Sequence, residues 1–188
     1  MPQRKTEFWL TFSSNINSEQ TTYLRTRIAT ILERKDFGSL VVLFSSDGGS
    51  TEQSLALHNF LIGLPVPVHM HAMGHIGSAS IPVYLAGCKR TAAPLSRFFF
   101  HEYDWEFDGR QTLRRIDEAV KRLRSDIEMA RTIIKTRTRA GADVFDALDG
   151  TAGPAILNAD QAKSIGLVDE VCELRHPIPN GTPIAMWT

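Results

Sequence analysis

Apolar residues recur along the chain with two different periods, and these periods predict strands that alternate with helices. Short runs of β-forming or continuously apolar residues are typical of strands, and they occur at residues 8–12, 40–44, 65–73, 91–92, 97–101 and 167–171. Apolar residues three and four positions apart are typical of helices, and they occur at residues 18–34, 51–61, 78–86, 143–148 and 158–165. The alternation predicts an α/β fold with a mainly parallel sheet.

One further predicted helix, at residues 110–137, is much longer than the others. Leu113, Ile116 and Val120 begin its apolar stripe, and charged side chains fill the positions between them. This pattern indicates an amphipathic helix of about 20 residues or more. Prolines in residues 175–188 predict an irregular tail. No internal repeat interrupts the pattern, so the sequence predicts a single domain over residues 1–188.

Composition and charge narrow the classes of function. Lys and Arg number 21, and so do Asp and Glu, which argues against a protein whose main partner is nucleic acid or an anionic membrane. The longest apolar runs fall far short of the roughly 20 residues that span a bilayer. The first residues lack the apolar stretch of a secretory signal, so we expect a cytoplasmic protein. Cys88 and Cys172 have no metal-binding spacing and are expected to be reduced, half-buried thiols.

Two glycines lie between a predicted strand and a predicted helix, in the sequence Asp47-Gly48-Gly49-Ser50. Glycine allows backbone N–H groups to face an anion, and the start of a helix adds a partial positive charge. The same residues are also typical of an ordinary turn between a strand and a helix. Chemistry at this turn is therefore a hypothesis that needs support from elsewhere in the chain.

Ser78 lies at a second junction of this kind, within residues 74–80. Backbone N–H groups at such a junction can flank a serine hydroxyl, as a nucleophile beside an oxyanion hole requires. The alternative is a structural role, with Ser78 or its competitor Ser80 as the N-cap of the helix. The sequence around Ser78 leaves both interpretations open.

Histidines supply two further candidates. His101 ends the apolar run at residues 98–100, and a polar ring there must find a partner or reach a cleft. His69 and His71 alternate along one predicted strand like a pair of metal ligands, but no third ligand follows at a suitable spacing. The sequence therefore predicts no metal site.

Together these segments resemble the proteolytic subunit of the Clp protease, the ClpP family. Residues 45–50 are similar to that family's Ser-Pro-Gly-Gly-Ser loop, with Asp47 in place of the proline, and residues 74–87 are similar to its nucleophile helix. Residues 94–101 are similar to its Pro-Asn-Ser-Arg…His segment, and residues 159–169 to its closing Ala-x-x-Ala…Gly-Leu-Val-Asp motif. The resemblance extends from about Phe8 to Val171.

The resemblance implies a ClpP/crotonase-type α/β fold of stacked ββα units. Residues 110–137 would be the handle helix, whose role in that family is to pair subunits across two rings. It implies a serine peptidase that cleaves peptides or unfolded proteins without a cofactor. Ser78 would be the nucleophile and His101 the general base. The N–H groups of Ala79 and of Gly48 or Gly49 would form the oxyanion hole.

Two departures from the family pattern affect the expected mechanism and partners. Counting back from the closing motif places Pro154 where the family carries its triad aspartate. Asp149 is the nearest upstream carboxylate and is our candidate for the third residue, with Asp146 as a further one. Few residues precede the first strand, so a Clp-type ATPase partner is not supported.

Three other functions remain open at this stage. The chain could be a degenerate ClpP-like subunit with a structural or regulatory role. It could be a crotonase-type acyl-CoA hydrolase, because that fold also uses glycine loops to hold a thioester oxyanion. It could be an α/β-hydrolase, which requires the motif Gly-x-Ser-x-Gly and a histidine near the tail. Residues 76–80 do not match this motif, although His176 is available as the histidine.

Overall fold

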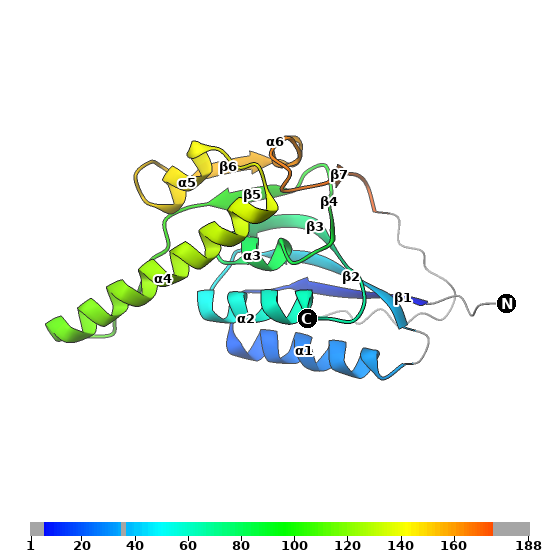
Figure 1. Ribbon diagram of the computed structural model, residues 1–188, viewed down its shortest axis with the longest axis horizontal. Helices are drawn as coiled ribbons and strands as arrows, with labels where there is room; N and C mark the ends of the chain where they lie inside the picture. The colour runs from blue at the N-terminus through cyan, green and yellow to red at the C-terminus, as the bar shows by residue number, and fades with distance from the viewer. Residues whose placement is uncertain (1–5, 35–36, 175–188) are drawn as a thin grey trace.

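A seven-stranded sheet forms the centre of the protein in the computed structural model, which describes residues 6–34 and 37–174 (Figure 1). The strands β1, β2, β3, β4 and β7 are neighbours in that order and run parallel, and β3 also pairs in parallel with β5. The pairing of β5 with β6 is antiparallel. The strands are β1 (Thr6–Ser13), β2 (Phe37–Ser46), β3 (Val68–Gly77), β4 (Lys89–Ala92), β5 (Arg97–Phe100), β6 (Ala155–Asn158) and β7 (Glu170–Val171). The prediction of a mainly parallel α/β fold is confirmed.

Helices connect the strands and cover the sheet. α1, α2 and α3 lie side by side along one face, and α5 and α6 lie next to β5 and β6 (Figure 1). The long α4 starts beyond the edge of the sheet and runs back across it to α5. The helices are α1 (Ser18–Leu32), α2 (Thr51–Ile62), α3 (Ser80–Tyr84), α4 (Leu113–Arg137), α5 (Ala142–Leu148) and α6 (Ala159–Ser164).

Polar side chains fix where several helices begin. Asn17, Ser50 and Thr112 each accept a hydrogen bond from a backbone N–H of the first turn of α1, α2 and α4, respectively. Asn158 does the same for α6, and Gln161 bonds back to the Asn158 N–H to complete a capping box. The prediction that Asn158 caps this helix is confirmed.

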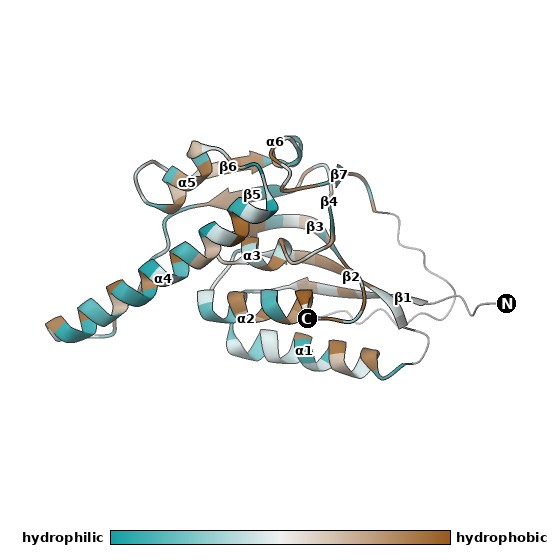
Figure 2. Ribbon diagram, in the orientation of Figure 1, coloured by the Kyte–Doolittle hydropathy of each residue, from teal (hydrophilic) through white to brown (hydrophobic). Residues whose placement is uncertain are grey.

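The core lies between the sheet and the helices along its face. Leu40, Val42 and Phe44 alternate along β2 and are almost completely buried, as are Ile28 of α1 and Leu57 of α2. Figure 2 shows the same arrangement, with hydrophobic residues along the strands and alternating polar and apolar residues along α4. Burying apolar surface stabilises by about 25 cal/mol per Å², so this core dominates the stability of the fold.

Several element boundaries differ from the sequence prediction. β3 continues through residues 74–77, and α3 is restricted to Ser80–Tyr84 instead of covering residues 78–86. The short β6 was not predicted, because its four residues follow a glycine-rich loop and alternate weakly. β7 covers only Glu170–Val171, and the buried Leu167 and Val168 precede it outside the sheet. The predicted irregular tail from residue 175 lies outside the described residues.

The cysteines and the helices can be compared with what the composition predicts. Cys172 is half-buried as expected, but Cys88 is exposed in the bend that precedes β4. Both cysteines are free thiols. Among the described residues, no helix combines the length and the apolar content needed to cross a membrane.

Candidate active site

Ser78 lies at the sharp turn between β3 and α3. Its φ is 53°, and within the described ranges it is the only residue other than glycine with a positive φ. The Ser78 N–H donates to the Phe99 carbonyl (2.9 Å), and the Ser78 carbonyl accepts from the Ile81 N–H (3.1 Å). A backbone in this region costs roughly 1–3 kcal/mol and persists only where the surroundings enforce it. The turn leaves the Ser78 side chain half-buried, within reach of a ligand.

The second serine of this turn has a structural role. Ser80 is completely buried, and its hydroxyl hydrogen-bonds to the carbonyl oxygens of Gly77 (2.6 Å) and Ser46 (3.0 Å). The N-cap position of α3 belongs to Ala79, and no side chain caps this helix. The interpretation of Ser78 or Ser80 as the N-cap is therefore wrong, because α3 starts later than the sequence suggests.

The glycine loop predicted from the sequence lies directly against Ser78. Gly48 and Gly49 have φ values of 109° and 133°, which favour glycine. A Cβ built on Gly48 would lie 2.8 Å from the Ser78 Cβ and 3.1 Å from the Ala79 nitrogen. The Gly48 carbonyl accepts from the Ile16 N–H (2.7 Å), which holds the loop in place. The fold thus brings the two glycine-containing junctions of the sequence together.

Backbone N–H groups near Ser78 differ in what they bind. The Gly48 N–H donates to the Ser46 hydroxyl (3.2 Å). Within the part of the chain that the structure describes, the N–H groups of Gly49 and Ala79 make no hydrogen bond. Two unused donors on either side of a serine suit the binding of a developing oxyanion.

Adding a single methyl group at Gly48 tests how closely the glycine loop packs against Ser78. We expect Gly48→Ala to destabilise the protein by about 1–3 kcal/mol, because the new Cβ would clash with Ser78 at an unfavourable φ. Gly153→Ala is the matched control, since a Cβ at Gly153 meets nothing within 4 Å. Thermal unfolding of both variants measures the difference. Equal melting temperatures for the two variants would show that Gly48 does not pack closely against Ser78.

His101 follows β5 directly, and the pairing of β5 with β3 brings it near Ser78. Gly77 is in register with Phe99, to whose carbonyl the Ser78 N–H also binds. The His101 ring is half-buried, stacks on Phe99 with 5.1 Å between centroids, and has Tyr103 at its edge. Among residues 6–34 and 37–174, no hydrogen bond joins the His101 ring to Ser78 or to a carboxylate. The strand pairing therefore brings the two residues to the same end of β3 and β5, without a hydrogen bond between their side chains among the described residues.

Pro154 occupies a specific place next to this histidine. β6 runs antiparallel to β5, with Ala155 paired to Phe100. Extending this register by one residue places Pro154 opposite His101. A proline side chain has no charge and no hydrogen-bonding group, so it cannot orient an imidazole. The position at which the resemblance implies an aspartate is thus beside His101 and holds no carboxylate.

Asp149, our candidate for the third residue, forms an ion pair elsewhere. Both of its carboxylate oxygens accept from the Arg131 guanidinium of α4. Its loop nevertheless reaches the neighbour of His101, because a Cβ on Gly150 would lie 2.5 Å from the Glu102 carboxylate. Asp146 is exposed on α5. For Asp149 to orient His101, its ion pair with Arg131 would have to open.

His58 contacts α3, the helix that follows the serine turn. It lies in α2, is buried, and its Nδ1 is 2.6 Å from the Pro82 carbonyl of α3. Burial lowers its pKa below the ordinary value of 6.5, against the opposing effect of this hydrogen bond. The neutral ring is therefore the form that the fold accommodates.

The lowered pKa predicts an acid-sensitive fold. The unfolded chain takes up a proton at His58 more readily, so this contribution to stability is complete above pH 6.5 and is lost as the pH falls below it. We expect the melting temperature of His58→Asn, whose amide can still donate to Pro82, to fall less between pH 7 and pH 5. Parallel melting curves for both proteins would contradict this assignment.

One feature of this site was not predicted from the sequence. A pocket of about 530 Å³ opens beside Gly49 and Ser50, and carboxylates from α2, α4 and the segment after β5 line it. Two of them, Glu52 and Asp126, are far apart in sequence, so no local motif marks the pocket. The alternation of acidic and aromatic residues at 104–107 was the one available signal.

Among the described residues, His69 and His71 of β3 belong to no cluster of metal-binding side chains. The His71 ring hydrogen-bonds to the Thr91 hydroxyl (2.7 Å). No group of three or more His, Cys, Asp and Glu side chains in the described ranges could hold a metal ion.

Comparison with known proteins identifies the family. The sequence model of the Clp protease family matches residues 5–175. The fold is similar to that of a ClpP1 mutant from Listeria monocytogenes, with a TM-score of 0.75 and 20% identity over 89% of this chain and 92% of that chain. A search among curated proteins gave no match. The matched segment contains the serine turn, the glycine loop and His101, and the chain belongs to the Clp protease family.

Proposed function

We propose that this protein is a serine peptidase that hydrolyses peptide bonds through an acyl-enzyme on Ser78. The enforced positive φ of Ser78 carries the proposal, because a strained residue without an evident structural role is typical of a functional site. Membership of the Clp protease family and the ClpP-like fold support a peptidase over other hydrolases.

In this mechanism His101 takes the proton of Ser78 as the serine oxygen attacks a peptide carbonyl. The carbonyl oxygen becomes an oxyanion, which the free N–H groups of Gly49 and Ala79 stabilise. We favour Gly49 over Gly48, whose N–H already donates to Ser46. His101 then gives the proton to the leaving amine, which departs with the C-terminal part of the substrate. Water, activated by the same ring, releases the acyl group and restores Ser78.

The stacking of His101 on Phe99 sets the starting position of the base. Catalysis requires the ring to approach Ser78 to hydrogen-bond distance, and contacts of this kind often tighten only when substrate binds. Asp149 remains our candidate to orient the ring, once its ion pair with Arg131 opens. While that pair is closed, Ser78 and His101 act as a dyad, and we expect slow turnover.

We also propose that the protein works as a homo-oligomer. Leu113, Ile116 and Val120 are exposed apolar side chains on α4, which extends away from the sheet (Figure 1). Apolar residues recurring along an exposed helix suit contact with another subunit. Sedimentation of the full chain gives the size of the assembly on which activity should be measured.

The decisive assay follows both peptide and thioester substrates. We expect the full chain to generate new peptide termini from an unfolded protein such as casein, and Ser78→Ala to generate none. Hydrolysis of acyl-CoA thioesters without peptide cleavage would favour the crotonase-type alternative. If the assembled protein cleaves neither, a structural or regulatory subunit becomes the better description.

A further inference from the structure

The pocket beside the glycine loop combines apolar walls with an excess of negative charge. Leu55 of α2 and Met129 of α4 form part of the walls, together with Trp105. Four carboxylates line the same space: Glu52, Asp104, Glu106 and Asp126. The volume of about 530 Å³ is within the range of small-ligand sites.

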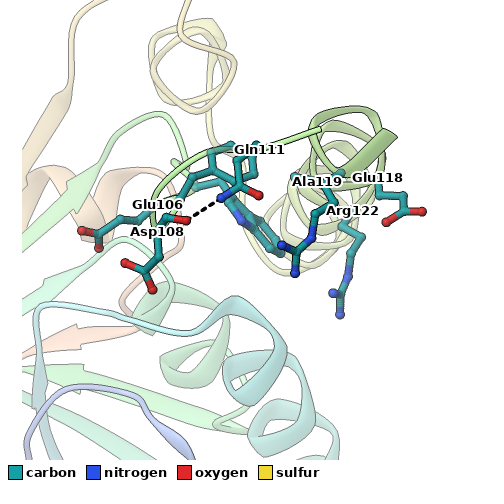
Figure 3. A pocket seen from close by; sticks show the side chains of 9 residues that line it. Glu106, Asp108, Gln111, Glu118, Ala119 and Arg122 are labelled. Atoms are coloured by element: carbon teal, nitrogen blue, oxygen red, sulfur yellow. Dashed lines mark hydrogen bonds between the residues drawn. The ribbon is translucent and has the colours of Figure 1, made fainter. Parts of the chain in front are cut away.

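Among the described residues that line the pocket, Arg122 is the one basic side chain, and it already contacts an aromatic ring. The Arg122 guanidinium lies over the Trp105 ring, 5.6 Å from its centroid. Figure 3 shows Arg122 on α4 and Glu106 on the segment between β5 and α4, around the adjoining hollow that shares these residues. One guanidinium cannot neutralise four carboxylates, so the pocket has a net negative charge.

Two polar groups in or next to the pocket are withdrawn from water. Asp126 lines the pocket, and Tyr103 lines an adjoining hollow that shares Asp104 and Trp105 with it. Burial raises the pKa of Asp126, with Arg122 opposing this change and Glu52 adding to it. The Tyr103 hydroxyl is buried and has no hydrogen-bond partner among the described residues. Burial raises the pKa of Tyr103, and the negative charge of Asp126 adds to this change. The pocket thus combines a carboxylate that is partly withdrawn from water with an adjacent buried hydroxyl that can accept a hydrogen bond from a ligand.

The pocket adjoins the proposed nucleophile. Gly49 lines it, and the preceding Gly48 packs against Ser78 and Ala79. A peptide whose carbonyl oxygen lies between the N–H groups of Gly49 and Ala79 would therefore place a neighbouring side chain at the mouth of the pocket.

We propose that this pocket binds a lysine or arginine side chain of the substrate next to the bond that Ser78 attacks, an inference that rests on the proposed function. The methylene groups pack against Leu55, Met129 and the Trp105 ring. The cationic end meets Glu52 and Asp126. An acidic side chain is excluded by charge repulsion.

Two serine-directed phosphonate esters that differ only in one amino group test the preference. One carries an aminobutyl side chain and the other the butyl chain without the amine, and both bind covalently to serine with loss of a phenol. We expect the amine to label Ser78 about tenfold faster, which is typical of a charged hydrogen bond. Equal rates, or a faster butyl compound, would overturn the inference.

Variants locate the effect. The double variant Glu52→Gln/Asp126→Asn should remove the preference for the amine, and each single change should reduce it. Asp117→Asn is the matched control, because Asp117 is an exposed carboxylate of the same helix α4 outside the pocket. A preference that survives the double variant would also overturn the inference.

A binding measurement separates this inference from the peptidase proposal. Agmatine, a guanidinium on a four-carbon chain, is titrated calorimetrically into Ser78→Ala. We expect saturable binding that the double variant weakens about tenfold, since it removes both carboxylates that meet the guanidinium. If no phosphonate labels Ser78 but agmatine binds in this way, the peptidase proposal fails and the cation pocket stands. If Ser78 is labelled and agmatine does not bind, the pocket fails and the peptidase proposal stands.

Discussion

Pro154→Asp is expected to raise the rate of peptide hydrolysis substantially, by about 10²- to 10⁴-fold. The upper figure is the usual cost of losing the aspartate that sets the tautomer of a catalytic histidine. The register of β5 and β6 places residue 154 opposite His101, so the new carboxylate would accept a hydrogen bond from the imidazole. Pro154 precedes β6 and is exposed, and the fold should therefore tolerate the change. Steady-state hydrolysis of a fluorogenic peptide measures the gain.

Two controls separate charge from flexibility. Pro154→Ala removes the ring without adding a carboxylate and should leave the rate nearly unchanged. His101→Ala placed in the Pro154→Asp background should remove the whole gain, because the carboxylate acts through the histidine. A rate in Pro154→Asp no higher than in Pro154→Ala would contradict the assignment of His101 as the base.

His101→Ala in the natural sequence is expected to lower peptide hydrolysis about 10³-fold, within the usual range for removal of a general base. Added imidazole should restore part of the lost rate, since the deleted ring leaves space beside Phe99. The rates with and without imidazole are compared for preparations of the same oligomeric state.

His75→Ala is the matched control for this variant. His75 also lies beside Phe99, with 6.0 Å between ring centroids, and its Nε2 is 3.7 Å from the Asp47 carboxylate. We expect His75→Ala to change the rate less than about tenfold, because His75 is not the general base and its loss would affect only the packing around Phe99. A larger loss in His75→Ala than in His101→Ala would assign the base to His75 instead.

The fold could be predicted from the sequence wherever one face or both faces of an element are apolar. The continuous apolar run of β2 and the stripe of α4 are examples, and both elements are present at the expected places. β6 and the start of α3 could not be predicted, because tertiary contacts define them. β6 exists through its pairing with β5, and α3 begins late because Ser78 is drawn into a turn by the Phe99 carbonyl.

For the candidate site, too, local motifs identify the residues, and long-range contacts decide their geometry. Ser78, the glycine loop and His101 could be named from the sequence because each belongs to a short motif. The positive φ of Ser78 and the position of Pro154 opposite His101 depend on strand register, which no local pattern reveals. The ion pair of Asp149 with Arg131 joins α5 to α4 and was likewise invisible in the sequence.

The most direct test of the central claim, an activated Ser78, is labelling by a fluorophosphonate probe located by mass spectrometry. We predict an adduct on Ser78 in the assembled natural protein, no adduct in Ser78→Ala, and strongly slowed labelling in His101→Ala. An adduct on Ser46 or Ser80 instead, or no adduct under conditions in which a known serine peptidase reacts, would contradict the account.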